Sequence, residues 1–230
     1  MPSKRIETEK KVAESLLIFI GFLYVVVFGL IIAGIFRDVL MPEDKPFSEK
    51  AVAILMVLAA FYFLVWDWLH GRLLTLKNHY SRYSRFFLEA LIAACAYGVA
   101  FAALRGSIFI LQFIALVLLL GSAWATITLR EYPKSRDKRE LKVIQEDQLY
   151  WGIVSEGFFI FCYFAVGTEI NIVIAITIVV FGWLFVFFYE RQIKRQKGLL
   201  GGPGVPFLKR EIMEKIRQKF RKKKGHQNEN

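Results

Sequence analysis

The chain has 230 residues, of which 56% are hydrophobic and 16% aromatic, and its mean hydropathy is +0.42. Soluble domains of this length are rarely so apolar, and here the apolar residues are gathered into long runs. The composition therefore excludes an ordinary soluble domain, and the formal net charge of +11 has to be explained within a membrane protein.

Six runs are long enough, or nearly so, to cross a bilayer as helices: residues 12–36, 51–69, 86–104, 108–129, 149–166 and 170–189. About 20 apolar residues in a helix span a hydrocarbon core of roughly 30 Å. Helices are expected because lipid cannot satisfy open backbone groups, and a membrane barrel would show alternating segments of about ten residues instead. We predict an all-α fold, a polytopic bundle of six transmembrane helices within residues 1–190, followed by a basic tail in residues 191–230.

The first run follows four basic residues, an order that secretory signal peptides share. A signal core has about 7–15 apolar residues and ends at a small-residue cleavage site. This run is longer and ends at Arg37 and Asp38. We therefore expect a first span that is retained.

The basic residues are divided unequally between the two sides of the predicted bundle. The N-terminal segment, the loops 72–85 and 130–142, and the tail hold 4, 4, 6 and 13 of the 31 Lys and Arg residues. The opposite side holds only the other four, Arg37, Lys45, Lys50 and Arg105. The positive-inside rule then predicts that both termini are cytoplasmic, in a cell membrane. Because topology explains the net charge, we do not expect a nucleic-acid partner.

Short loops and small residues predict how the spans pack. The loops at 105–107 and 167–169 allow only tight hairpins, which join the third span to the fourth and the fifth to the sixth. The third span is rich in Ala and Gly, which lets backbones approach closely in lipid, so we expect it to be central. The sixth is apolar nearly all round and is expected to be peripheral and lipid-facing. Arg105 and Glu169 could form an ion pair between the two turns.

Two segments outside the spans also show helical patterns. In residues 131–148, Leu141, Ile144 and Gln148 would share one face of a helix that runs into the fifth span. Residues 207–221 predict a basic amphipathic helix, typical of an anionic membrane surface, although a helix that docks on a protein has the same pattern. Its lipid-surface residues would be Lys209, Arg210, Lys215, Arg217, Lys219 and Arg221.

Polar residues within the spans indicate a candidate site, because ionisable groups in lipid are costly and tend to be functional. A rise of about 1.5 Å per residue places Asp67, Glu89 and Glu156 at similar depths in the cytoplasmic half. Small polar groups lie at the same level on the fourth span, and a tyrosine lies two turns beyond Glu156. We hypothesise one polar cavity lined by Glu156, Asp67, Glu89, Ser122, Thr126 and Tyr163.

Each of the three acids also has a structural interpretation. Glu89 can pair with Arg85, four residues earlier, and Asp67 can bond to His70 or reach Arg72. Glu156 has no polar residue one turn away, so its partner has to come from another helix, water, or a bound ion or proton.

The sequence carries no nucleophile, ion-filter or voltage-sensor motif, and its three histidines are scattered. We therefore expect no enzyme activity and no cofactor. Our first interpretation is a small transporter or channel subunit for a proton, a cation or a small solute. The alternative is a non-catalytic membrane scaffold that binds anionic lipid, or a cytoplasmic or membrane protein, through its basic loop and tail. On general grounds a protein of this size also commonly forms a homo-oligomer.

Overall fold

The computed structural model describes residues 2–77, 83–132, 138–168 and 170–196. The chain divides into two compact units, Met1–Tyr189 and Glu190–Asn230, and the account below concerns the first. The described residues form the helices α1 (Pro2–Gly34), α2 (Phe47–Lys77), α3 (Tyr83–Leu104), α4 (Phe109–Glu131), α5 (Lys138–Val166) and α6 (Ile172–Gln196), with a π-helical segment η1 (Ile35–Leu40) directly after α1. The first unit contains all of these except the last turns of α6, after Tyr189.

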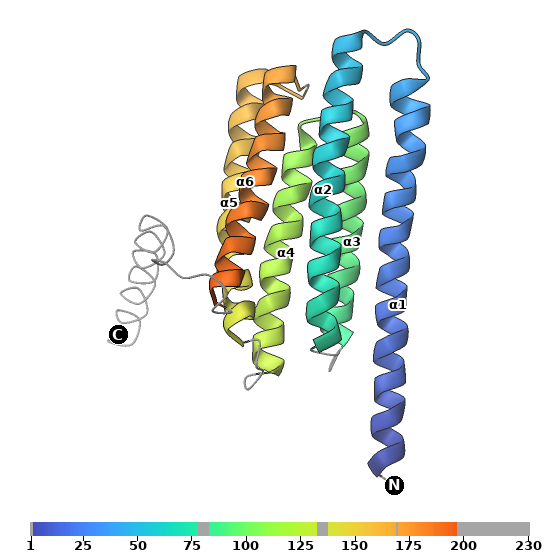
Figure 1. The fold of residues 1–230 in the computed structure, drawn as a ribbon, viewed down its shortest axis with the longest axis vertical. Coiled ribbons are helices and arrows are strands. Elements are labelled where there is room, and N and C mark those ends of the chain that lie inside the picture. The colour runs from blue at the N-terminus through green and yellow to red at the C-terminus, as the bar shows by residue number, and fades with distance from the viewer. Residues whose placement is uncertain (1, 78–82, 133–137, 169, 197–230) are drawn as a thin grey trace, which may run out of the picture. The chain divides into compact units, whose positions relative to one another are not determined.

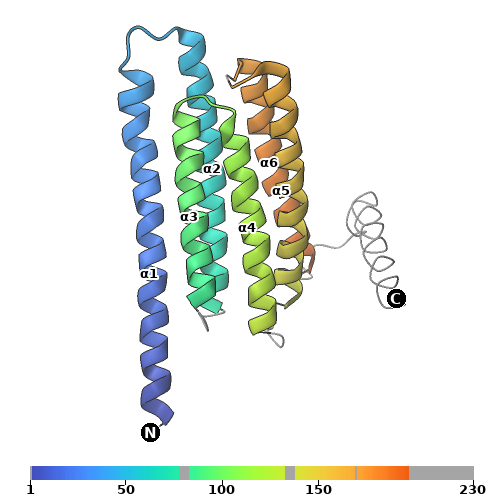
Figure 2. The ribbon, with the colours of Figure 1, turned by 180° about the vertical axis from the view of Figure 1, so that it is seen from behind.

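Within the described residues the fold is all-helical, and all six α-helices are long and apolar enough to cross a membrane. Successive helices alternate in direction in Figures 1 and 2, so the chain goes back and forth along one axis. The prediction of a six-helix, multi-pass membrane bundle is confirmed in this respect. We call the end that carries the α2–α3 and α4–α5 connections the basic end, and the other the opposite end.

The helices extend beyond the runs that hydropathy predicts. α1 begins at Pro2, ten residues before the predicted span, and α2 continues to Lys77, where the prediction ends at residue 69. α5 begins at Lys138, so most of the predicted loop 131–148 forms its first turns. Leu141, Ile144 and Gln148 are buried there, which confirms that they share one helix face.

The spans are packed most closely around α3 and α4. α3 contacts α1, α2 and α4, which agrees with its expected central place. Gly98 lets α4 approach, since a Cβ atom there would lie 2.5 Å from the ring of Phe113. The α3–α4 turn passes through Gly106 at a φ of +60° and the α5–α6 turn through Gly167 at +78°, a region that favours glycine.

The two turns at the opposite end are joined through the backbone. The Ile108 amide donates a hydrogen bond to the Thr168 carbonyl (3.2 Å), and the Ile170 amide donates to the Gly106 carbonyl (3.4 Å). Glu169, the expected ion-pair partner of Arg105, lies outside the described residues. The hairpins α3–α4 and α5–α6 are therefore held to each other by main-chain bonds.

α6 packs on the bundle through aromatic rings. Phe181 lies edge-on to Trp151 of α5 with ring centroids 5.2 Å apart, and Phe185 lies 5.1 Å from Trp66 of α2. Its other face is exposed, as a peripheral helix requires, for example at Val173. Only one face of α6 is therefore exposed, as the expected lipid-facing helix requires. The other face is buried, at Ala175, Ile178, Phe185 and Tyr189.

The predicted amphipathic helix at 207–221 lies outside the described residues. The same holds for its six basic residues, Lys209, Arg210, Lys215, Arg217, Lys219 and Arg221.

Candidate functional site

A partly open cavity of about 60 Å³ lies in the half of the bundle nearer the basic end. Five helices contribute to its wall, with Tyr24 from α1, Asp67 from α2, Glu89 from α3, Gly121 from α4 and Gln148 from α5. A water molecule needs roughly 10–15 Å³ on this measure, so the cavity has room for a few waters or a small ion with part of its hydration shell. We call it the acidic cavity.

Asp67 is held by a residue that the sequence analysis did not consider. The Tyr24 hydroxyl on α1 donates a hydrogen bond to Asp67 Oδ2 at 2.6 Å. The local partners proposed from sequence are engaged elsewhere, since a hydrogen bond joins His70 Nε2 to the Tyr189 hydroxyl (2.8 Å) and Arg72 reaches the Leu17 carbonyl (3.5 Å). Asp67 therefore links α2 to α1 across the wall of the cavity.

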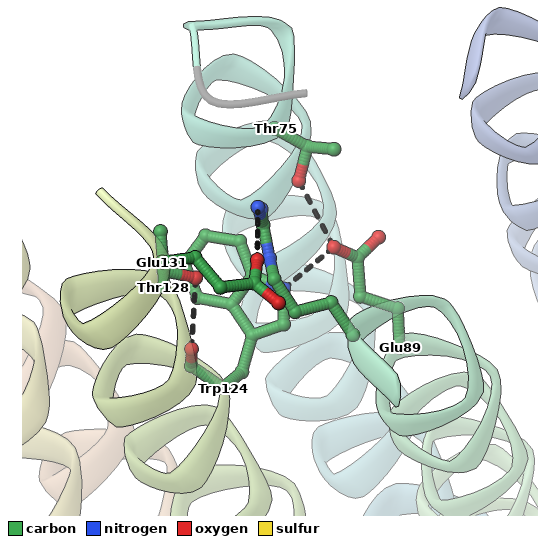
Figure 3. A network of polar contacts seen from close by, with 6 residues as sticks. Thr75, Glu89, Trp124, Thr128 and Glu131 are labelled. Carbon is green, nitrogen blue, oxygen red and sulfur yellow. Dashed lines mark hydrogen bonds and ion pairs between the residues drawn. The ribbon is translucent and has the colours of Figure 1, made fainter. Parts of the chain in front are cut away.

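Glu89 is held by two neutral donors from two other helices. The Trp124 indole N–H on α4 donates to Glu89 Oε1 at 2.6 Å, and the Thr75 hydroxyl on α2 donates to the same oxygen at 3.0 Å. Figure 3 shows Thr75 and Trp124 converging on one carboxylate oxygen of Glu89. Trp124 is buried and lines the cavity, so its ring fixes the carboxylate against the cavity wall.

Gln148 presents its side-chain amide to the cavity. Its side chain is buried, and its Oε1 atom makes no hydrogen bond within the described residues. Gly121 makes room for the amide, because a Cβ atom there would lie 2.3 Å from Gln148 Oε1. A buried acceptor without a donor is costly, so a water or a ligand proton in the cavity would stabilise this arrangement.

Arg72 supplies a positive charge at the rim of the same cavity. It is half-buried, and its Nη1 atom lies beside α1 where Gly21 leaves space, since a Cβ there would be 3.2 Å away. Because its hydrogen bond goes to a carbonyl group on α1, the guanidinium keeps its charge available to the cavity.

A buried ion pair lies near Glu89 at the basic end of the bundle. Arg85 is fully buried, and its Nη1 atom lies 3.4 Å from Glu131 Oε2. Its guanidinium lies 5.0 Å from the centre of the Trp124 ring and 5.9 Å from that of Tyr132, distances typical of cation–π contacts. Trp124 therefore contacts both the cavity acid, Glu89, and the buried cation, Arg85.

Ser122 and Thr126 are part of the α4–α5 interface and are not among the residues that line the acidic cavity. The Ser122 hydroxyl donates to the Gln145 carbonyl (2.8 Å), and the Gln145 side-chain amide donates to Thr126 Oγ1 (2.8 Å). Thr126 also donates to the Ser122 carbonyl, one turn earlier (2.9 Å). Their polar groups are thus satisfied where two helices meet.

Glu156 and Tyr163 also lie away from the acidic cavity. Glu156 is half-buried and has no hydrogen bond or ion pair within the described residues, whereas its neighbour Ser155 is fully buried. Tyr163 is 41% exposed and packs against Phe109 and Phe159. The structure thus brings together Asp67 and Glu89 of the six residues expected from sequence, and adds Tyr24, Trp124 and Gln148.

The site offers carboxylates but no cluster of metal ligands. Among the described residues, no group of three or more His, Cys, Asp and Glu side chains is placed to hold a metal ion. Two carboxylates, an amide oxygen and a tyrosine hydroxyl can instead accept or relay a proton, or bind a small cation with water. No family model, curated protein or solved structure matches this chain.

Proposed function

We propose that this protein is a small membrane transporter or channel subunit for a proton, a cation or a small solute, with its binding site in the acidic cavity. The observation that carries the proposal is the meeting of Asp67 and Glu89, from two helices, in one small internal space. Such groups are rare within membrane spans and mark ion and proton pathways. We place both termini in the cytoplasm of a cell, because the basic end holds most of the Lys and Arg residues.

The chemistry of the cavity favours a cationic ligand. Two ionised carboxylates in one small space repel each other, and a bound proton or cation relieves that repulsion. Asp67 uses Oδ2 for the bond from Tyr24, which leaves Oδ1 to contact a ligand. Arg72 at the rim balances one of the two negative charges, so the site suits a single positive charge.

Packing in the opposite half favours a carrier over an open channel. The side chains of Ala96, Val99, Ala100 and Ala103 on α3 are fully buried, as are Ile110 and Leu111 on α4. Such tight packing leaves no wide path along α3 and α4 from the acidic cavity toward the opposite end. A carrier would reach that end by rearranging its helices, as alternating-access transporters do.

The test is ion flux into liposomes that contain the purified protein, under a pH gradient or a membrane potential. We expect Asp67→Asn and Glu89→Gln each to reduce flux by at least about tenfold, since each removes a charge from the binding site. Normal flux in both variants, with the protein correctly folded, would contradict the proposal.

Glu156→Gln is the matched comparison, because it makes the same change in a span but outside the cavity. Glu156 is one of the six residues expected from sequence in the polar cavity, but it does not line the acidic cavity in the structure, so we expect its variant to retain flux. Absence of flux in the wild-type protein for protons and for a panel of monovalent cations would instead favour the scaffold function. Deletion of residues 207–230 would then be expected to abolish binding of a partner or of anionic lipid.

A further inference from the structure

A second pocket lies at the opposite end of the bundle, between η1, the α1–α2 loop and α3. Its volume is about 530 Å³. Its lining divides into an apolar wall and a charged rim: Leu30, Tyr97, Phe101 and Leu104 form the wall, and Arg37, Asp38, Pro42, Lys45 and Arg105 form the rim. We call it the basic-rim pocket.

The rim gathers most of the positive charge at this end. Only four of the 31 Lys and Arg residues belong to the opposite side, and three of them, Arg37, Lys45 and Arg105, line this one pocket. The fourth, Lys50, lies outside it. On a side of a membrane protein where cations are scarce, their convergence on one pocket indicates a role for the charge.

Asp38 is the one acid among the residues that line the pocket. Arg37 forms a two-bond pair with Asp38, from Nε to Oδ1 at 2.6 Å and from Nη2 to Oδ2 at 2.8 Å. Lys45 Nζ donates instead to the Asp38 main-chain carbonyl at 2.8 Å. The Asp38 carboxylate thus accepts hydrogen bonds only from Arg37 among the three cations, although its charge also acts on Lys45 and Arg105. With three cations and one acid, the lining of the pocket keeps a positive net charge. Glu43 and Asp44, on the same loop, are exposed and do not line the pocket.

Arg105 is positioned against an aromatic ring. Its guanidinium lies 4.1 Å from the centre of the Phe101 ring, one turn earlier on α3. Within the described residues it makes no hydrogen bond or ion pair. A guanidinium carries five N–H donors, a set that suits an anion bound at the rim.

The shape of the pocket depends on a local irregularity where α1 ends. Over Ile35–Leu40 the chain forms a π-helix, with the Met41 amide bonded to the Phe36 carbonyl at 3.0 Å. Segments of this kind are rare and occur frequently at functional sites. Just before it, Gly34 lets α1 lie against Leu104, since a Cβ there would be 2.4 Å from the Leu104 side chain. The π-helix then directs Arg37 and Asp38 to the rim.

We propose that the basic-rim pocket binds one anionic phospholipid, with its phosphate at Arg105 and Lys45 and an acyl chain along Tyr97 and Phe101. The wall belongs to helices that cross the membrane and is half-exposed, with Tyr97 at 46% and Phe101 at 40%. The rim lies where these helices end. This combination of an apolar wall and a cationic rim matches the two parts of a lipid molecule, and it does not depend on what the acidic cavity transports.

The test uses the full chain in liposomes that contain a photoreactive phosphatidylglycerol, with labelled peptides mapped by mass spectrometry. We expect label on residues 30–45 and 97–105, and little from a phosphatidylcholine probe with the same chains. Arg105→Ala should reduce this label by about tenfold, as loss of a charged hydrogen bond predicts. Arg105→Lys should retain much of it, and Lys50→Ala, the matched loss of charge at the same end, should leave it unchanged.

Because the label is read at these peptides, lipid bound at the basic end does not contribute. Equal labelling by the two lipids would contradict a role for the rim cations, and so would an equal loss in Arg105→Ala and Lys50→Ala. Excess glycerol phosphate, which has the phosphate but no acyl chain, should not displace the probe. Displacement would show that the pocket binds a free anion and would overturn the lipid assignment.

Discussion

The acidic cavity and the basic-rim pocket differ from each other in charge, size and place. The cavity, about 60 Å³, collects carboxylates inside the end of the bundle that is richest in Lys and Arg. The pocket, about 530 Å³, collects cations at the rim of the end where they are scarce. The charge of each site is thus opposite in sign to the charge that prevails, or is expected, at its end of the bundle. The membrane topology alone explains neither the acids of the cavity nor the cations of the pocket. Matched variants at the two sites test this contrast.

The two arginines beside these sites should differ most. Arg85, near the cavity, is fully buried with Glu131, whereas Arg105, at the pocket, is exposed. We expect Arg85→Met to lower the free energy of unfolding by about 3–5 kcal/mol, because it leaves Glu131 buried without its cation. Arg105→Met should change it by no more than about 0.5 kcal/mol. Thermal unfolding in detergent measures both.

The second variant that checks this assignment is Arg85→Met combined with Glu131→Gln. Since it removes both charges, it should recover a large part of the lost stability. If Arg85→Met were as stable as Arg105→Met, the buried pair would have no structural role at the basic end.

The tyrosines of the two sites provide the next comparison. Tyr24→Phe removes the hydrogen bond to Asp67 and leaves that carboxylate without its described donor. We expect a loss of about 1–3 kcal/mol in stability and a change in flux, because only the weaker bond from Arg72 to the Leu17 carbonyl then joins α2 to α1 at the cavity within the described residues. Tyr97→Phe is the control, since the Tyr97 hydroxyl makes no hydrogen bond within the described residues. Equal unfolding temperatures for the two variants would contradict a structural role for the Tyr24–Asp67 bond.

The smallest effect is expected at the glycines. A Cβ at Gly121 would lie 2.3 Å from Gln148 Oε1, so Gly121→Ala should push the amide of Gln148 within the cavity. The cost should be about 1 kcal/mol, at the low end for overpacking, because the end of this side chain can rotate away. Gly29→Ala adds the same methyl group where no atom lies within 4 Å. A helical alanine should stabilise the protein slightly there, as measured by unfolding and flux in parallel.

The spans could be predicted from sequence because the bilayer demands long apolar helices, but the ends of these helices could not. α2 continues to Lys77, past His70, Gly71 and Arg72, where the predicted span had ended. The π-helix at Ile35–Leu40 leaves no apolar pattern of its own, and the predicted first span ends within it, at residue 36. The basic-rim pocket, which depends on it, was therefore missed.

The candidate site was predicted in part, because depth along a helix can be counted whereas direction around it cannot. Asp67, Glu89 and Glu156 were placed at similar depths, but only the first two face the cavity. A helix turns by about 100° per residue, so the full burial of Ser155 does not extend to Glu156. Tyr24 could have been noticed in the sequence, because its hydroxyl is the only polar side-chain group between Ser15 and Arg37 in the first span.

The main-chain bonds between the turns at Gly106 and Thr168 have a mechanical consequence. They hold the hairpins α3–α4 and α5–α6 together at the opposite end, while the hydrogen bonds of Ser122 and Thr126 with Gln145 join α4 to α5 in the half nearer the basic end. The two hairpins are thus fastened to each other near both ends. A movement that widens the acidic cavity would therefore carry α4 and α5 together as one rigid unit.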